Sequence, residues 1–256
     1  MVIVRNITEI NDFKQLRDIQ QSAWGFGEEE TEPHHLMTRV QKYGGLVQGL
    51  WLDDKMVGFS YAVPGRWEGE FFLYSHMLAV IRELQSQGYG FVLKKAQREE
   101  ALKMGYSVIR WNFDPLESLN TYFNIHRLGA VSVEYERDIY GVGESGLHKG
   151  LPTDRLIATW RLDSDRVARR MESKIPSLVE RVPSDRIGDF SGEVTYVEIP
   201  KNIREIKMRD LSEALNWRIR TREMFEDAFR KGYTVTEIVF SEDRERVFCK
   251  LERANI

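Results

Sequence analysis

One cysteine, no long apolar run and no strong excess of either charge set the first limits on this chain of 256 residues. The single thiol, Cys249, excludes an internal disulfide and favours a reducing compartment, so we expect a cytoplasmic protein. No apolar stretch approaches the roughly 20 residues of a membrane span, and the apolar start at Met1–Arg5 is too short for a secretion signal. A net charge of −3 does not favour nucleic acid as a partner.

Hydrophobic residues make up 42% of the sequence and charged residues 30%, the balance of an ordinary globular protein. At this length we expect one large domain, or one domain with an extension. The spacing of the apolar residues alternates between the periods of strands and helices. The sequence therefore predicts an α/β protein with a mixed sheet.

The most informative segment spans residues 78–90. An apolar strand at Ser75–Val80 leads into a polar turn with the spacing Gln-x-x-Gly-x-Gly, and a helix follows at Phe91–Met104. Backbone N–H groups at such a turn and at the start of a helix form a cradle for phosphate oxygens. Gly88 and Gly90 allow positive φ and close backbone approach. The segment therefore predicts a ligand that carries a pyrophosphate.

Three ligand classes use a glycine turn of this kind. A dinucleotide fingerprint needs a third glycine, and Leu93 stands in its place. A phosphate loop for nucleoside triphosphates ends in Gly-Lys-Ser/Thr, which does not follow here. The third pattern is the CoA turn, Arg/Gln-x-x-Gly-x-Gly/Ala after a strand, which Gln85, Gly88 and Gly90 match in register.

On these residues the sequence resembles the GNAT N-acetyltransferase superfamily, and its uncharacterised predicted-acetyltransferase branch most closely. One departure is Arg82, which replaces the proline often found after the strand. The resemblance implies acetyl-CoA, or another acyl-CoA, as cosubstrate and no metal. It places Leu78, Ala79 and Val80 along the pantetheine arm. It also implies that the pyrophosphate lies on the backbone of Gln85, Ser86, Gln87, Gly88, Tyr89 and Gly90.

The expected elements follow the order β-α-α-β-β-β-α-β-α-β-β, which is the GNAT order. We therefore predict a GNAT acyl-CoA acyltransferase domain at residues 1–162, a linker at 163–192 and a C-terminal β-α-β-β extension at 193–256. The extension is interpreted as a covering layer that packs on the main domain, or as a degenerate partial copy of it. Its long helix is expected to bury an apolar arc through Leu211, Leu215, Ile219, Phe225 and Phe229.

His76 is the candidate proton acceptor, because imidazole titrates near neutral pH. Strand alternation places it on the face of Leu78 and Val80. The spacing His-x-Leu-Ala-Val is similar to the strand histidine of arylalkylamine acetyltransferases, which implies a base that works through water. A hydrogen-bonded core histidine is the alternative interpretation.

The candidate proton donor is less typical of the superfamily. Many GNAT enzymes carry a tyrosine four residues before the glycine that ends the next helix, and Ile125 occupies that place here. Tyr122 lies about one turn earlier and is the substitute we predict. The resemblance also places Asn120 near the cofactor. Ordinary helix packing and capping is the alternative for both residues.

The acidic loop Glu28–Glu32 lies where the superfamily shapes its acceptor pocket, so it would attract a cationic amine or is simply a solvated charge run. The sequence thus predicts direct transfer of acetyl from acetyl-CoA to a small-molecule or protein amine. The alternative is a catalytically silent acyl-CoA sensor or scaffold. The resemblance also allows a homodimer. Adjacent His34 and His35 would face apart on a helix, and no metal site is predicted.

Overall fold

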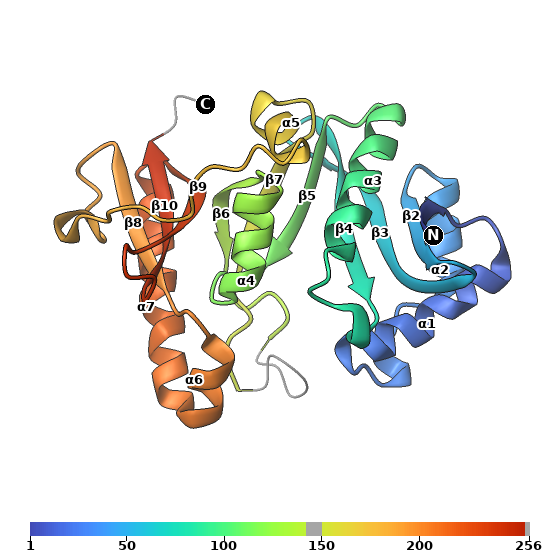
Figure 1. Cartoon of the computed structure of the whole chain (residues 1–256), viewed down its shortest axis with the longest axis horizontal. Helices are drawn as coiled ribbons and strands as arrows, with labels where there is room; N and C mark the ends of the chain where they lie inside the picture. The colour runs from blue at the N-terminus through green and yellow to red at the C-terminus, as the bar shows by residue number, and fades with distance from the viewer. Residues whose placement is uncertain (142–149, 254–256) are drawn as a thin grey trace. The chain divides into compact units, whose positions relative to one another are not determined.

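The computed structural model describes residues 1–141 and 150–253, which form two compact units (Figure 1). The first unit contains Met1–Trp111 and Arg161–Asp163. The second contains the described residues of Asn112–Trp160 and Ser164–Ile256. The segment predicted as one domain, residues 1–162, is therefore shared between the two units.

The first unit is built on a sheet with the strand order β1-β2-β3-β4-β5, in which only the β4–β5 pair is parallel. Its strands are β1 (Val2–Asn6), β2 (Leu46–Leu52), β3 (Lys55–Trp67), β4 (Glu70–Val80) and β5 (Val108–Phe113), the last of which continues into the second unit. Its helices are α1 (Ile10–Trp24), α2 (His34–Lys42) and α3 (Tyr89–Lys103), with short 3-10 turns at Glu28–Glu30 and Arg82–Leu84. The strand predicted at Ser75–Val80 is the second half of β4, and the helix predicted at Phe91–Met104 is α3 to within two residues at each end.

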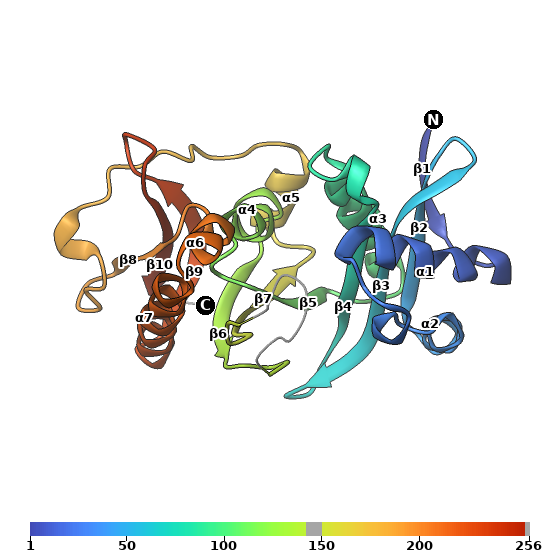
Figure 2. The same cartoon turned by 90° about the horizontal axis from the view of Figure 1, so that it is seen from below.

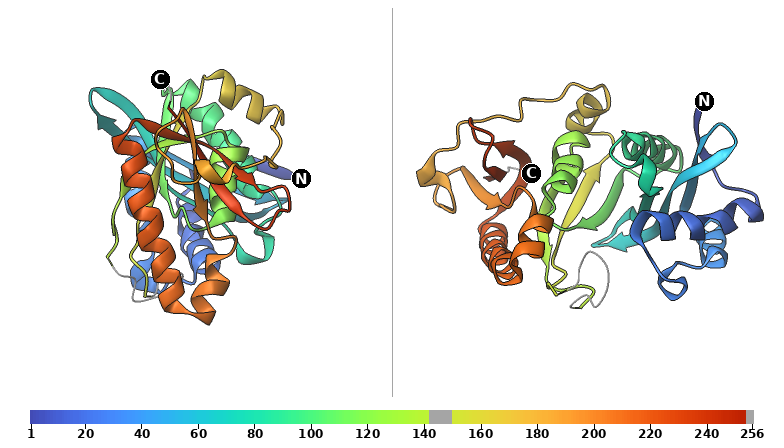
Figure 3. Two further views of the ribbon diagram at one scale, coloured as in Figure 1. Left: turned by 90° about the vertical axis from the view of Figure 1, so that its left-hand side faces the viewer. Right: turned by 60° about the horizontal axis from the view of Figure 1, so that its bottom comes forward.

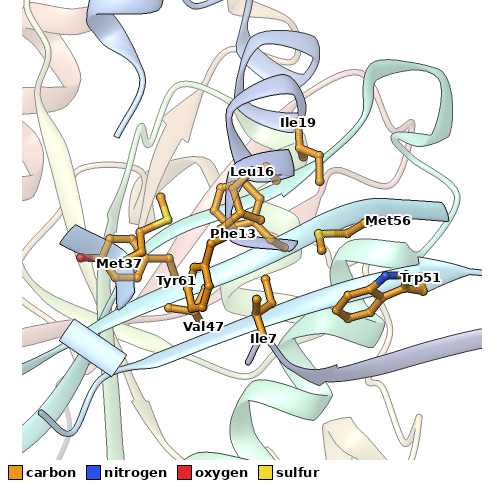
Figure 4. Packing of buried hydrophobic residues seen from close by; sticks show 11 residues of the cluster. Ile7, Phe13, Leu16, Ile19, Met37, Val47, Trp51, Met56 and Tyr61 are labelled. Carbon is orange, nitrogen blue, oxygen red and sulfur yellow. The ribbon is translucent and has the colours of Figure 1, made fainter. Parts of the chain in front are cut away.

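Two apolar cores cover opposite faces of this sheet. Phe13 and Leu16 of α1 pack with Ala79 of β4 in a larger cluster that also contains α2 (Figure 4). Leu93 of α3 packs with Val80 in the other cluster. Because neighbouring strand residues point to opposite faces, α1 and α2 cover one face and α3 covers the other (Figure 2).

The second unit has the strand order β7-β6-β9-β10-β8. Its strands are β6 (Val131–Glu136), β7 (Arg155–Arg161, whose last residue belongs to the first unit), β8 (Val194–Ile199), β9 (Tyr233–Phe240) and β10 (Val247–Arg253). Its helices are α4 (Ser118–Thr121), continued by a wide π-helical turn at Tyr122–Arg127, then α5 (Asp165–Met171), α6 (Ile203–Arg209) and α7 (Leu211–Arg230), with a 3-10 turn at Ser184–Arg186. The mixed α/β class predicted from the sequence is confirmed.

The long helix α7 packs against β6, β8 and β9 (Figure 3). Of the predicted apolar arc, Phe225 is buried as expected, but the N-terminal part of the arc is not. Leu215 and Ile219 of the expected arc are exposed, whereas Arg218 is buried. Arg218 donates to Asp114 Oδ2 at 2.6 Å, and this ion pair turns the helix so that a charged residue faces inward. The buried positions are Ala214, Arg218, Thr221, Phe225 and Ala228.

The strand order of the C-terminal extension differs from that at the start of the first unit. In the first unit, the strand directly after the two helices, β2, lies between β1 and β3. In the extension the last strand, β10, lies between β8 and β9. The helix α6 was also not predicted. Among the described residues, no helix is both long and apolar enough to cross a membrane.

Candidate active site

The predicted phosphate turn connects β4 to α3. Gly88 has a φ of 90° and is the residue before the helix, and Ser86 also has a positive φ of 62°. Gly90 lies inside α3 and has no positive φ, so that part of the expectation is wrong. The first hydrogen bond of α3 runs from the Phe91 N–H to the Gly88 carbonyl at 3.0 Å. The N–H groups of Tyr89 and Gly90 precede this bond and have no acceptor within the helix, which suits them to bind phosphate oxygens.

The Gln85 side chain closes this turn. Its Nε2 donates to the carbonyl of Val80 at 3.1 Å, at the end of β4, and to the carbonyl of Ala23 at 3.3 Å, near the end of α1. Gln87 Nε2 donates to the carbonyl of Glu83 at 3.0 Å. These two side chains therefore bond to the protein's own backbone and hold the turn in shape. The backbone N–H groups of the turn are the groups that could bind phosphate oxygens.

The strands β4 and β5 separate shortly after they meet. The described ladder contains the parallel pairs Leu73↔Ile109 and Tyr74↔Arg110 and no later pair. From Ser75 to Val80, β4 pairs only with β3 on its other side. The result is a fork whose closed end is at Tyr74 and whose open end leads to the phosphate turn. Unpaired backbone groups along such a fork can pair with an extended amide-containing ligand.

A β-bulge at His76 sets the orientation of the candidate base. Met77 pairs with Tyr61 and Ser75 with Ala62, so His76 is an extra residue in β4. Its ring contacts the Tyr61 ring edge-on at 5.7 Å, on the face covered by α1 and α2. Leu78 packs on the α3 face. The prediction that His76 shares the face of Leu78 is therefore wrong, because the bulge shifts the alternation by one residue.

The carboxylate that contacts His76 was not predicted individually. Glu32 Oε1 lies 3.2 Å from His76 Nε2. The buried Gln20 of α1 holds the Glu32 backbone: its Oε1 accepts from the Glu32 N–H at 2.8 Å and its Nε2 donates to the Glu32 carbonyl at 3.4 Å. In the sequence, Glu32 is one member of an acidic run and Gln20 is one residue of a predicted helix, so neither was predicted to contact or support His76.

This arrangement selects one tautomer of His76. An ionised carboxylate can only accept a hydrogen bond, so Nε2 carries the proton and Nδ1 keeps its lone pair. Among the described residues, no hydrogen bond to Nδ1 is formed. Burial, with a smaller contribution from the charge of Glu32, raises the pKa of Tyr61 to about 12, so the neighbouring phenol stays protonated at neutral pH. The site therefore offers one proton acceptor, supported by a carboxylate.

A small hollow of about 120 Å³ lies beside Glu32. It is lined by Arg17, Glu28, Thr31, Glu32, Pro33 and His34. Arg17 Nη1 is 4.0 Å from Glu28 Oε1, so this carboxylate is partly compensated. The predicted acidic loop thus reaches the same side of the sheet as His76.

The other predicted cofactor residues on β4 contribute their side chains to the two cores. Ala79 packs on the α1 face and Val80 on the α3 face. Any contact of Leu78, Ala79 and Val80 with a ligand in the fork would therefore be made by their backbone groups.

Asn120 and Tyr122 belong to the second unit. The Tyr122 ring stacks on the His126 ring, with centroids 5.2 Å apart, and Asn120 Oδ1 accepts from Asn124 Nδ2 at 3.3 Å. Ile125, at the position usual for the tyrosine, is fully buried. The wide turn at Tyr122–Arg127 is a π-helical segment, a feature that is frequent at functional sites.

No group of three or more His, Cys, Asp or Glu side chains that could hold a metal ion occurs in the part of the chain that the structure describes.

Solved structures of other proteins are similar in fold to this chain. A search of curated protein sequences found no match. A GNAT-family protein from Desulfovibrio desulfuricans is 19% identical, with a TM-score of 0.51 over 63% of this chain and 99% of its own. The ribosomal-protein-S18-alanine N-acetyltransferase of Escherichia coli is 20% identical, with a TM-score of 0.50 over 64% and 96%. The protein yncA of Salmonella typhimurium, solved with its cofactor acetyl-CoA, is 15% identical, with a TM-score of 0.50 over 64% and 95%.

At these identities the structural comparisons establish the fold alone. The sequence itself gives a separate similarity, because residues 13–122 match the model of the acetyltransferase (GNAT) family. This match includes β4, the phosphate turn and α3, which are the elements that carry the fork. Residues 13–122 are thus the part of this chain that is similar to the acetyltransferase (GNAT) family.

Proposed function

We propose that this protein transfers an acetyl group from acetyl-CoA directly to an amine, without a covalent enzyme intermediate. The observation that carries the proposal is the fork between β4 and β5, which opens onto a glycine turn at the start of a helix. CoA has a pyrophosphate at one end of an extended arm that contains amides. The turn would hold the pyrophosphate, and the backbone of Leu78 to Val80 would pair with the arm.

In this arrangement the thioester lies towards the closed end of the fork, near the bulge at His76. The attacking amine must lose a proton, and His76 Nδ1 is the acceptor, directly or through one water. Glu32 stabilises the imidazolium that forms, because its carboxylate is 3.2 Å from Nε2. The carboxylates of Glu28 and Glu32 would also attract a cationic acceptor.

The acceptor is proposed only as an amine, small or attached to a protein. Location in the cytoplasm and pairing into a homodimer stay predictions from the sequence. A second function, acyl-CoA binding without transfer, is favoured by one observation: Ile125 fills the place of the usual proton-donating tyrosine and is fully buried.

Release of the CoA thiol from acetyl-CoA in the presence of a panel of amines tests the proposal. The wild-type protein should release thiol with at least one class of amine, and His76→Ala should lower kcat about 10²- to 10⁴-fold. The acid limb of the pH–rate profile should also disappear in His76→Ala, because that limb reflects protonation of the general base.

His35→Ala is the matched control, because this neighbouring histidine is exposed on α2 and should leave kcat unchanged. Equal turnover of His76→Ala and wild type across the pH range would remove His76 from the mechanism. Tight binding of acetyl-CoA without thiol release for any amine class would favour the non-transferring alternative.

A further inference from the structure

Lys94 of α3 is a buried cation at the candidate site that the sequence did not single out. Its residue is 3% exposed. Its ammonium donates to Ser75 Oγ at 2.9 Å and to Gln97 Oε1 at 3.0 Å, and it lies 3.8 Å from the centroid of the Trp111 ring. These three contacts are with neutral groups: a hydroxyl, an amide oxygen and an indole face.

The position of Lys94 in the fork is more informative than its burial. The last described ladder pair of β4 and β5 is Tyr74↔Arg110, and Ser75 and Trp111 are the next residues on the two strands. Lys94 contacts both of them. Its ammonium therefore lies where the two strands begin to separate, at the closed end of the fork. It approaches from the α3 face, whereas His76 faces α1 and α2.

Transfer of the acetyl group requires two proton movements. The amine nitrogen bonds to the carbonyl carbon and loses a proton, and the carbon–sulfur bond breaks with its electron pair on the sulfur. His76 accepts the first proton in the proposed function. The departing thiolate needs a donor, and Ile125 stands where a tyrosine usually supplies one.

We propose, resting on the proposed function, that Lys94 is the proton donor to the CoA sulfur, acting from the α3 face while His76 accepts a proton on the α1 face. A proton moves from Nζ to the sulfur as the carbon–sulfur bond breaks, which gives CoA thiol and a neutral lysine. Solvent then returns a proton to Nζ after the product leaves.

The environment of Lys94 suits a donor. Burial lowers the pKa of Lys94 to about 7, so a charged form that gives up its proton readily is present at neutral pH. The neighbouring titratable groups face other partners: His76 contacts Glu32, Arg98 donates to the Leu162 carbonyl, and Arg110 lies over the Phe72 ring.

The test compares Lys94→Met with Lys95→Met, because Lys95 is the next residue of the same helix and is exposed. Lys94→Met should lower kcat about 10²-fold or more. Its Kd for acetyl-CoA, measured by calorimetry, should stay within about threefold, and its pH–rate profile should lose the alkaline limb near pH 7 that the wild type shows. Lys95→Met should match the wild type in all three.

Several outcomes would overturn the role of Lys94. One is a wild-type profile without an alkaline limb near pH 7, which needs no variant to detect. Another is a Lys94→Met protein that keeps the wild-type kcat and limb. A third is loss of the limb in Tyr122→Phe instead, which would assign the donor to Tyr122. Failure of the wild type to bind acetyl-CoA would reject the proposed function together with this role, and calorimetry identifies that case separately.

Discussion

Lys94 in the first unit is buried and Glu237 in the second unit is largely buried, and the two charged groups have different neighbours. Lys94 in the first unit contacts a hydroxyl, an amide and an indole ring. Glu237 in the second unit accepts from Arg170 Nη2 at 2.6 Å and lies 2.8 Å from His126 Nδ1. Arg166 Nη2 is 3.9 Å from the same carboxylate.

The pKa directions differ in their causes. Burial alone would raise the pKa of Glu237, but the hydrogen bond from His126 and the charges of His126, Arg166 and Arg170 outweigh it, and the pKa falls below its usual range. For Lys94, burial dominates and lowers the pKa. Glu237 is thus stabilised as an ion by the fold, whereas the fold disfavours the ionised form of Lys94. A buried charge that weakens the fold is a candidate for function, while a compensated one is structural.

The largest expected effect on stability is that of Glu237→Gln. It leaves Arg170 and His126 buried without their counter-charge, which should cost about 3–5 kcal/mol of unfolding free energy at pH 7. Because the pKa of Glu237 is lowered in the folded state, this contribution is complete above the unfolded pKa of about 4.3 and is lost as the pH falls through the folded pKa. Urea unfolding at several pH values measures both the loss of unfolding free energy and its dependence on pH.

Glu198→Gln is the control for this experiment. Glu198 pairs with Arg246 on the surface of the second unit, so its loss should cost no more than about 1 kcal/mol. Equal costs for the two substitutions would show that the Glu237 cluster is not the structural ion network described here.

Lys94→Met should have a smaller effect of opposite sign. Between pH 7 and the unfolded lysine pKa of about 10.4, the unfolded chain binds a proton that the folded chain does not, so wild-type stability rises with pH through this lysine. At pH 6 the variant escapes the cost of a buried ammonium, which is on the order of 5 kcal/mol, and should be more stable by this amount less what the lost hydrogen bonds contribute.

This advantage should shrink as the pH approaches 10, and Lys95→Met should show none. Thermal and urea unfolding of the three proteins across this range measure it. A Lys94→Met protein that is less stable than the wild type at pH 6 would indicate that Lys94 is a structural hydrogen-bond donor and would remove the contrast with Glu237.

The smallest expected effect is that of Leu215→Gln on α7. The residue is 36% exposed, so the substitution should change the unfolding free energy by less than about 0.5 kcal/mol. Phe225→Ala, on the buried face of the same helix, should cost about 3–5 kcal/mol. If both substitutions lowered the unfolding free energy by similar amounts, Leu215 would be as buried as Phe225, as the sequence predicted.

Local signals in the sequence were sufficient for the turn and for most element bounds. Gly88 and the bond from Gln85 to the Val80 carbonyl act within a few residues of their own positions, so the motif spacing already indicates a helix that starts at a phosphate cradle. The second bond of Gln85, to the Ala23 carbonyl, is long-range and gave no local signal. The face of His76 could not be predicted, because the bulge in β4 depends on the register against β3. The buried face of α7 could not be predicted either, because Arg218 is buried by Asp114, 104 residues away in the sequence.

The role of Lys94 could not be predicted from the sequence either, because it depends on contacts between distant segments. In the sequence it is one of two adjacent lysines on a helix, and only the packing of α3 beneath Ser75 and Trp111 distinguishes it from Lys95. The sequence motif of the first unit therefore predicts the ligand of the fork, CoA, more readily than it predicts the side chains that would transfer protons to or from it.

Calorimetric titration of the wild-type protein with acetyl-CoA, CoA, ATP and NAD tests the central claim most directly. If the fork and its turn bind the CoA arm, acetyl-CoA and CoA should each bind at one site per chain, and ATP and NAD should not compete with them. Selective binding of ATP or NAD, with no heat from acetyl-CoA, would contradict the assignment of the fork to CoA.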